Sequence, residues 1–291
     1  MIKCIATDMD GTLVLADQTI SQENIEAIKM AQDRGIEVIV ATGRSYEEAI
    51  FPLKESGIVC PIICMNGSEI RDEKGTILRS IPIDEPTFLT IQNILQDQDI
   101  YYEIYTNKGT YSNDYDKSLA VISDILLSSG LKASYEEIIE GIKERFERGR
   151  IKTIETYNEL LKERDIELLK LLVFSLDSEK LSDAEKKLKE ISNIAVSSSG
   201  HQNLEVTNIH AQKGIALEAF VEEKNISIKE TMALGDSYND VSMFERVGCA
   251  VAMGNAPEDI QNMCHFVTDR NEHHGVAKAI HKVLNETASQ I

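Results

Sequence analysis

The stretch Asp8-Met9-Asp10-Gly11-Thr12-Leu13 follows the apolar run Ile2-Lys3-Cys4-Ile5-Ala6-Thr7. An apolar run that ends in two acids and a glycine predicts a buried strand opening into a tight polar loop. Ligands of open parallel sheets bind at the carboxyl ends of the strands, and two carboxylates held close there repel unless a cation or a proton separates them. The stretch therefore predicts a metal site, although Asp-x-Asp-Gly also suits an ordinary Asx-type turn.

Three further polar loops follow apolar strands in the same way. Thr42-Gly43-Arg44 comes after a strand at 36–41, Asn66-Gly67 after one at 61–65, and Asp236-Ser237-Tyr238-Asn239-Asp240 after one at 231–235. A helix that opens at Lys213-Gly214 follows a strand expected at 203–207. This alternation of strands and helices predicts a parallel sheet, whose carboxyl-end loops meet at one edge.

The middle third of the chain has a different character. We expect a hairpin over 69–82, strands at 101–105 and 168–176, and helices at 115–128, 135–147 and 178–191, whose Lys and Glu runs are solvated faces. The alternating pattern breaks near Asp84-Glu85-Pro86 and returns near 203. We therefore predict a discontinuous core domain of 1–83 and 199–291, with 84–198 inserted as a second domain.

Composition limits the kinds of partner. The 291 residues carry a formal net charge of −19, which opposes binding to nucleic acid or to anionic membranes. No apolar run approaches the ~20 residues of a membrane span, and the amino terminus does not resemble a secretion signal, so we expect a cytoplasmic protein. The five cysteines suit reduced core positions, and Cys60-x-x-x-Cys64 has no second pair with which to form a metal site.

The polar loops combine acids, a hydroxyl, an ammonium and backbone amides, and this mixture suits phosphoryl transfer. Each element also has a plainer interpretation. Thr42-Gly43 could be a simple strand-to-helix turn, and Asp240 could only cap the helix that follows Ser237. Lys213 lies at a helix N-terminus, where the dipole disfavours a cation, so its position indicates a nearby anion. His273-His274 could be a metal pair, although adjacent rings rarely converge on one ion.

Together the four motifs resemble those of the haloacid dehalogenase superfamily in order and spacing. These motifs are Asp8 to Leu13, Ala41-Thr42-Gly43-Arg44, Lys213-Gly214 and Gly235 to Asp240. The long insertion, with Met65-Asn66-Gly67 before it and Asn255-Ala256-Pro257-Glu258 after it, is similar to the Cof-type subfamily. The resemblance implies an α/β fold, with a Rossmann-like parallel-sheet core and an inserted α+β cap domain that selects the substrate.

The resemblance also implies a phosphatase mechanism. Asp8 would be the nucleophile and form an aspartyl-phosphate, and Asp10 would protonate the leaving oxygen and then activate water. Mg²⁺ would bind Asp8, the backbone carbonyl of Asp10, and Asp236. The phosphoryl oxygens would be held by Thr42, Lys213, Asn239 and the amides of Met9 and Gly43. Asp240, Arg44 and Asn66 would support the site.

The implied substrate is a small phosphorylated metabolite, such as a sugar phosphate, and the protein would be a monomer or a homodimer. Two alternatives remain at this point. A phosphotransferase or mutase would use the same intermediate, and a regulatory module would only accept phosphate on Asp8.

Overall fold

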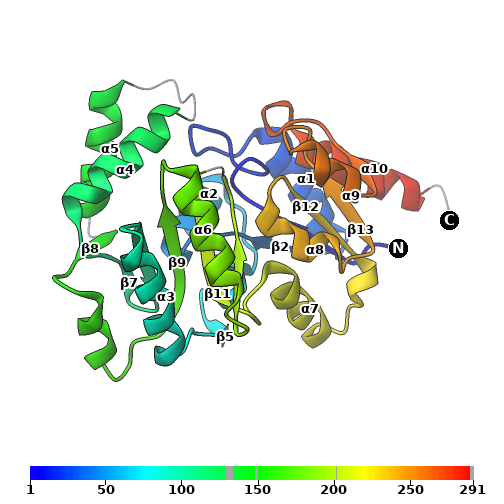
Figure 1. Ribbon diagram of the computed structural model, residues 1–291. Helices are drawn as coiled ribbons and strands as arrows, with labels where there is room; N and C mark the ends of the chain where they lie inside the picture. The colour runs from blue at the N-terminus through cyan, green and yellow to red at the C-terminus, as the bar shows by residue number, and fades with distance from the viewer. Residues whose placement is uncertain (129–133, 148–149, 201, 289–291) are drawn as a thin grey trace. The chain divides into compact units, whose positions relative to one another are not determined.

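The chain folds into two compact units. In the computed structural model, Met1–Ser80 and His210–Ile291 form unit 1, and Ile81–Ile209 form unit 2 (Figure 1). The structure describes residues 1–128, 134–147, 150–200 and 202–288. Within these ranges no helix is both long enough and apolar enough to cross a membrane.

Unit 1 is built on an eight-stranded sheet. Its strand order is β14-β13-β12-β1-β2-β3-β4-β5. All neighbours from β14 to β3 pair in parallel, whereas β4 and β5 form an antiparallel hairpin at one edge. In chain order the strands are β1 (Cys4–Thr7), β2 (Glu37–Ala41), β3 (Ile62–Cys64), β4 (Glu69–Arg71), β5 (Ile77–Ser80), β12 (Thr231–Gly235), β13 (Cys249–Ala252) and β14 (Phe266–Val267). The parallel sheet and the hairpin confirm the sequence predictions.

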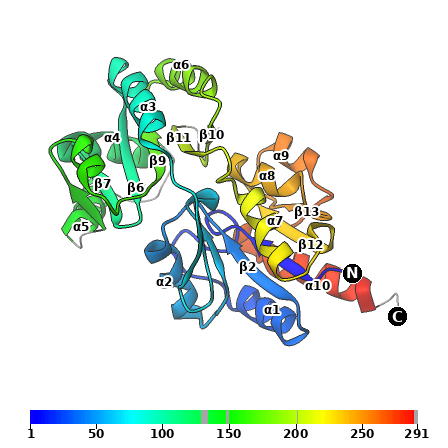
Figure 2. The ribbon, with the colours of Figure 1, turned by 90° about the horizontal axis from the view of Figure 1, so that it is seen from below.

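Helices cover this sheet because its central strands are apolar on both faces. On one face Ala6, Ile39 and Ala233 pack with Leu217 and Phe220 of α7 (Lys213–Glu223). Side chains alternate along a strand, so Ile5, Val38 and Val40 point to the opposite face. The remaining helices are α1 (Gln22–Asp33), α2 (Tyr46–Ser56), α8 (Val241–Phe244), α9 (Glu258–Met263) and α10 (Gly275–Ala288). Figures 1 and 2 show α7 beside α8 and α1 beside α10.

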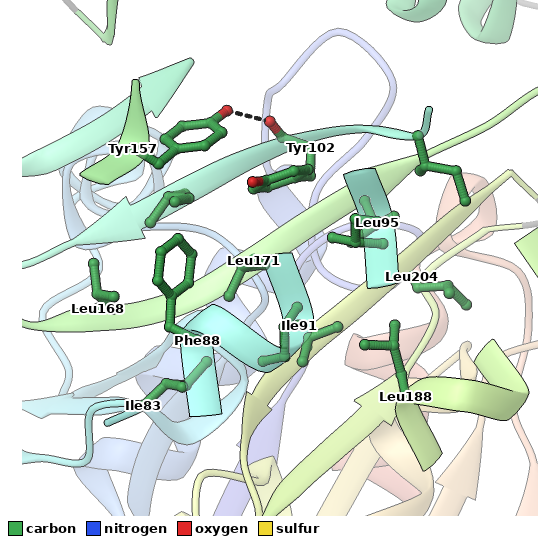
Figure 3. Close-up of a cluster of buried hydrophobic side chains, with 14 of the residues drawn as sticks. Ile83, Phe88, Ile91, Leu95, Tyr102, Tyr157, Leu168, Leu171, Leu188 and Leu204 are labelled. Atoms are coloured by element: carbon green, nitrogen blue, oxygen red, sulfur yellow. Dashed lines mark hydrogen bonds between the residues drawn. The ribbon is translucent and has the colours of Figure 1, made fainter. Parts of the chain in front are cut away.

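Unit 2 has a mostly antiparallel sheet in the order β10-β11-β9-β6-β7-β8. Its elements are α3 (Glu85–Asp97), β6 (Tyr101–Thr106), β7 (Gly109–Ser112), α4 (Tyr115–Ser128), α5 (Tyr135–Glu147), β8 (Ile151–Thr153), β9 (Leu168–Phe174), α6 (Ser178–Lys189), β10 (Ile194–Ser197) and β11 (Asn203–Asn208). The expected helices and the two expected strands in this region are confirmed. Figure 3 shows one apolar core of the unit, where Phe88 and Ile91 of α3 pack against Leu171 of β9 and the Tyr157 hydroxyl donates to the Tyr102 carbonyl.

The strand at 203–208 is a correction to the sequence analysis. We expected it in the core sheet, but β11 pairs antiparallel with β9 and β10 of unit 2. The unit boundary therefore falls at 209/210 instead of 198/199, and the first boundary at 80/81 instead of 83/84. The alternation of apolar and polar residues in this strand indicates an antiparallel sheet. Leu204 and Val206 join the apolar core of unit 2, and the polar residues Glu205 and Thr207 alternate with them.

Candidate active site

The predicted polar loops of unit 1 meet at the carboxyl edge of its parallel strands. Asp8 directly follows β1, and its backbone N–H donates to the carbonyl of Leu234 in β12 at 2.9 Å. Asp236 follows β12 itself. Because β1 and β12 are neighbouring parallel strands, these two carboxylates emerge side by side although 228 positions separate them in the chain.

Lys213 is the centre of the site. Its ammonium lies 2.7 Å from Oδ1 of Asp8, 2.7 Å from Oδ1 of Asp240 and 3.4 Å from Oδ1 of Asn239. The side chain is completely buried at the start of α7, where burial and the helix dipole both disfavour a cation. The two carboxylates outweigh this cost and raise the pKa of Lys213, so it stays charged. The nearby anion that its position predicted is therefore present.

Asp240 both caps a helical turn and fixes Lys213. Its Oδ2 accepts hydrogen bonds from the backbone N–H groups of Asp236 and Ser237, which is the capping interaction expected from the sequence. Its Oδ1 accepts from Lys213. Asp240 therefore both caps the helical turn, through Oδ2, and supports the site, through the bond from Lys213 to Oδ1.

Asp8, Asp236 and Asp240 form an acidic cluster in which one oxygen from each lies within 4.8 Å of the others. Burial, together with the charges of Asp240, Asp236 and Asp10, raises the pKa of Asp8 well above its usual value despite Lys213. Burial and then the charge of Asp240 raise the pKa of Asp236 to about 7. Crowded carboxylate oxygens are the donors that Mg²⁺ and Ca²⁺ prefer, so the cluster fits a divalent cation, which would relieve this repulsion.

Two residues that the sequence analysis did not assign hold Asp236 in place. The Thr12 hydroxyl donates to Oδ1 of Asp236 at 2.9 Å. The Asn255 amide donates to Oδ2 at 3.3 Å and also to the carbonyl of Gly11 at 2.8 Å. Gly11 has a φ of +74°, and a Cβ there would lie 2.3 Å from Oδ2 of Asp236. Asn255 lies in the loop after β13, three residues beyond the end of that strand, so its place in the sequence does not by itself indicate a contact with Asp236.

The structure does not bring the Asp10 carboxylate into the acidic cluster. This side chain is 60% exposed, and both of its oxygens accept hydrogen bonds from Arg44, at 2.8 Å from Nε and 2.5 Å from Nη2. The expected metal contact of Asp10 involves only its backbone carbonyl and stays a prediction. Arg44, expected as a supporting residue, is thus the partner of Asp10.

The predicted phosphate-binding loop lies after β2. Thr42 is buried, and its hydroxyl oxygen accepts from the backbone N–H of Arg44 at 3.2 Å, which shapes the turn around Gly43. Asn66 adopts a left-handed conformation with a φ of 57°, and its Oδ1 accepts from the Asn239 amide at 3.4 Å. The Asn66 N–H also donates to the Thr42 carbonyl at 3.0 Å, so Thr42, Asn66 and Asn239 belong to one constellation.

Met9 completes the predicted site residues, and the sequence leaves the role of two histidines open. Met9 is buried in the first loop, where its carbonyl accepts from the N–H groups of Thr12 and Val14. His274 lies 3.4 Å from Glu23, and neither it nor His273 belongs to the acidic cluster. The two histidines, for which the sequence leaves a metal pair open, therefore take no part in the constellation around Lys213.

The fold and this constellation define a protein with a parallel α/β core and a buried site in which carboxylates surround a lysine. A family model described as haloacid dehalogenase-like hydrolase matches residues 5–280. The phosphatase YwpJ of Bacillus subtilis is 33% identical over 97% of this chain and 100% of its own length. The 5-amino-6-(5-phospho-D-ribitylamino)uracil phosphatase YwtE of the same organism is 35% identical over 98% of this chain and 99% of its own length.

A solved structure agrees with these matches. A haloacid dehalogenase-like hydrolase from B. subtilis superposes with a TM-score of 0.87 and 33% identity, covering 96% of this chain and 99% of that one. The chain belongs to the haloacid dehalogenase-like hydrolases, as the four sequence motifs predicted. Within that family it is a phosphatase of the Cof type, so the predicted fold class and enzyme class are confirmed.

Proposed function

We propose that this protein is a Mg²⁺-dependent phosphatase of small phosphorylated metabolites, with an aspartyl-phosphate formed on Asp8. One observation carries the proposal: a buried lysine holds one oxygen of Asp8 at 2.7 Å, while a carboxylate oxygen of Asp236 lies within 4.8 Å of one of Asp8. Lys213 fixes the direction of the Asp8 carboxylate, and its charge would attract the phosphoryl oxygens of an approaching ester.

The chemistry proceeds in two displacements. An oxygen of Asp8 attacks phosphorus, the phosphorus–oxygen bond to the alcohol breaks, and Asp10 gives its proton to the departing oxygen. Asp10 then removes a proton from water as the water attacks the aspartyl-phosphate, which releases inorganic phosphate and restores Asp8. A divalent cation bound to Asp8, the Asp10 carbonyl and Asp236 would neutralise charge between the nucleophile and the phosphoryl group.

The remaining predicted residues would hold the phosphoryl group. We assign its oxygens to the hydroxyl of Thr42, the ammonium of Lys213, the amide of Asn239 and the backbone N–H groups of Met9 and Gly43. Asn239 supports this role because its Oδ1 lies 3.4 Å from the Lys213 ammonium. Thr42 supports it because it is buried and its carbonyl accepts from the N–H of Asn66, whose side chain contacts Asn239. Fixed donors of this kind need no reorganisation when charge develops on the phosphoryl oxygens.

The test is release of inorganic phosphate from a panel of phosphorylated metabolites with Mg²⁺ and no added acceptor. The proposal expects turnover by the native chain, and Asp8→Asn should abolish it while the thermal unfolding profile stays that of a folded protein. Exposed Asp33, changed to Asn on α1, is the matched control and should leave turnover unaltered. Phosphate release that requires a sugar acceptor would favour a phosphotransferase, and a long-lived phosphoprotein without turnover would favour a regulatory module.

We assign substrate selection to unit 2, the predicted cap. The relative YwtE is named for its action on 5-amino-6-(5-phospho-D-ribitylamino)uracil, so this compound belongs in the panel beside sugar phosphates. Exchanging Ile81–Ile209 for the corresponding segment of YwtE should shift the order of substrates toward that of YwtE. p-Nitrophenyl phosphate, whose leaving group needs little recognition, should remain a substrate of both proteins. An unchanged order of substrates would contradict the assignment.

A further inference from the structure

The Asp10 carboxylate is held more firmly than an exposed side chain usually is. Arg44 engages both of its oxygens in a bidentate pair, at 2.8 Å and 2.5 Å, although Asp10 itself is 60% exposed. Bidentate pairs fix the plane of a carboxylate as well as its position, because two parallel hydrogen bonds leave no free rotation. An unpaired carboxylate only two residues from Asp8 could instead turn toward the acidic cluster.

Arg44 is itself fixed at both ends. Its backbone N–H donates to the Thr42 hydroxyl at 3.2 Å, and its carbonyl accepts from the N–H of Met65 at 2.9 Å. At the other end, Nη2 also donates to Oε1 of Gln18 at 2.6 Å. The guanidinium therefore spans two acceptors, which a lysine ammonium on a flexible stem would not hold in the same plane.

Gln18 lies in a tight turn between Leu15 and Thr19. The Gln18 N–H donates to the Leu15 carbonyl at 3.0 Å, and the Leu15 N–H donates to the Thr19 carbonyl at 2.9 Å. Gln18 has a φ of 67°, a left-handed conformation that a residue other than glycine adopts at some cost in energy. The turn itself accounts for this conformation, because a three-residue hairpin loop places a left-handed residue at its last position. In that position the Gln18 side chain accepts from Arg44.

We propose that Arg44 and Gln18 are positioning residues for Asp10, and we name the pair the Asp10 clamp. The clamp holds the Asp10 carboxylate outside the acidic cluster and directed at the leaving oxygen, so that proton donation and cation binding stay with different carboxylates. This inference rests on the proposed function, because Asp10 needs no fixed direction in a protein that does not transfer phosphoryl groups.

The choice of leaving group tests the clamp. The alkoxide that leaves ribose 5-phosphate must be protonated, whereas p-nitrophenolate departs with little help. The kcat/KM value reports only the steps up to departure of the leaving group, so the later activation of water does not enter the comparison. A well-placed general acid contributes about 10²–10⁴-fold, and a displaced one loses part of that factor.

We expect Arg44→Met to lower kcat/KM for ribose 5-phosphate, or for the aliphatic ester that the panel turns over fastest, by roughly 10–100-fold. The value for p-nitrophenyl phosphate should stay within about threefold. Arg44→Lys, which keeps the charge but not the planar donors, should show the same selectivity to a smaller degree. Exposed Arg34 at the end of α1 provides the control, and Arg34→Met should change neither substrate.

Gln18 offers a matched pair of variants. Gln18→Asn tolerates the left-handed turn but is too short to reach Arg44, so it should lower the ratio of aliphatic to aryl kcat/KM by about threefold. Gln18→Glu keeps the acceptor oxygen and should leave the ratio within about twofold. In an Asp10→Asn background, Arg44→Met should have no further effect on the ratio, because the two residues act as one unit.

The clamp would be overturned by equal losses for both substrates, which indicate a phosphate-binding or structural role of Arg44, or by no loss for either. Additive effects of Asp10→Asn and Arg44→Met on the ratio would overturn it as well. If the native chain releases phosphate and only the ratio stays unaltered, the clamp fails and the proposed function stands. If the native chain turns over no phosphate ester, both fail.

Discussion

Replacing Asp236 with Asn should remove a pH-dependent instability of the cation-free protein. The pKa of Asp236 rises from 3.8 to about 7 on folding, chiefly through burial and the charge of Asp240. The folded protein then binds this proton more tightly than the unfolded chain does. The stability that Asp236 contributes is therefore complete below the unfolded pKa of 3.8 and is lost as the pH rises through about 7.

The size of the effect follows from the two titration curves. Between about pH 5.5 and about pH 8 the unfolding free energy that Asp236 contributes falls by about 2 kcal/mol. For a domain of ~150–250 residues this corresponds to a change in Tm of about 4–8 °C. Asp8 changes in the same direction, since its pKa is also raised, so Asp236→Asn should remove only part of the slope of the native chain.

Thermal unfolding at the two pH values, with a chelator and then with Mg²⁺, measures this effect. Mg²⁺ should raise the Tm of the native chain more at the higher pH, and it should raise that of Asp236→Asn little at either. Because Asn presents an amide where Oδ2 accepts from Asn255, the absolute Tm of the variant carries its own cost, and the slope with pH is the quantity to compare. An unchanged slope, or equal Mg²⁺ stabilisation of the variant, would refute the assignment of Asp236 to the cation site.

Two further changes test neighbouring contacts. Lys213→Met leaves Asp8 and Asp240 buried without the ammonium that they share, so the unfolding free energy from denaturant titration should fall by about 3–5 kcal/mol. Phosphate release should show no measurable turnover, and a fully stable variant would contradict the role of this ion pair. Asn255→Ala removes one of the two donors that orient Asp236, so Mg²⁺ affinity by calorimetry should fall by about 10–100-fold. The variant also loses hydrogen bonds to the Gly11 carbonyl and from the Asn271 N–H, so the affinity is measured well below its own Tm; unchanged affinity would exclude Asn255 from the support of this site.

Much of the site could be predicted because each of its residues is tied to a regular element. Asp8 and Asp236 follow apolar strands, and Lys213 opens a helix, so the topology of parallel sheets alone brings them to one edge. The presence of an anion beside Lys213 was foreseeable for a different reason: an ammonium at a helix N-terminus requires a nearby negative charge.

The remainder depends on distances that the chain does not encode locally. The direction of the Asp10 carboxylate is set by Arg44, which lies 34 positions away in the chain. The pattern of apolar and polar residues does not predict which side chain this guanidinium will contact. The support of Asp236 by Asn255 likewise depends on the spacing of β12 and β13. For β11 two sequence signals disagreed. Its position shortly before Lys213 favoured the sheet of unit 1, whereas its alternation of apolar and polar residues favoured the antiparallel sheet of unit 2, where it lies.

The pairing of Lys213 with Asp8 across 205 positions also bears on biosynthesis. At ~5–20 residues per second, roughly 10–40 s pass on the ribosome between the two residues, and β1 lacks its β12 neighbour throughout that interval. A nascent chain would thus carry an apolar strand with one open edge until its final third emerges, a condition that invites chaperone binding or misassembly. Slow translation before residue 231 would prolong that exposure, whereas a pause after residues 231–235 have left the ribosomal tunnel would find the strand already covered.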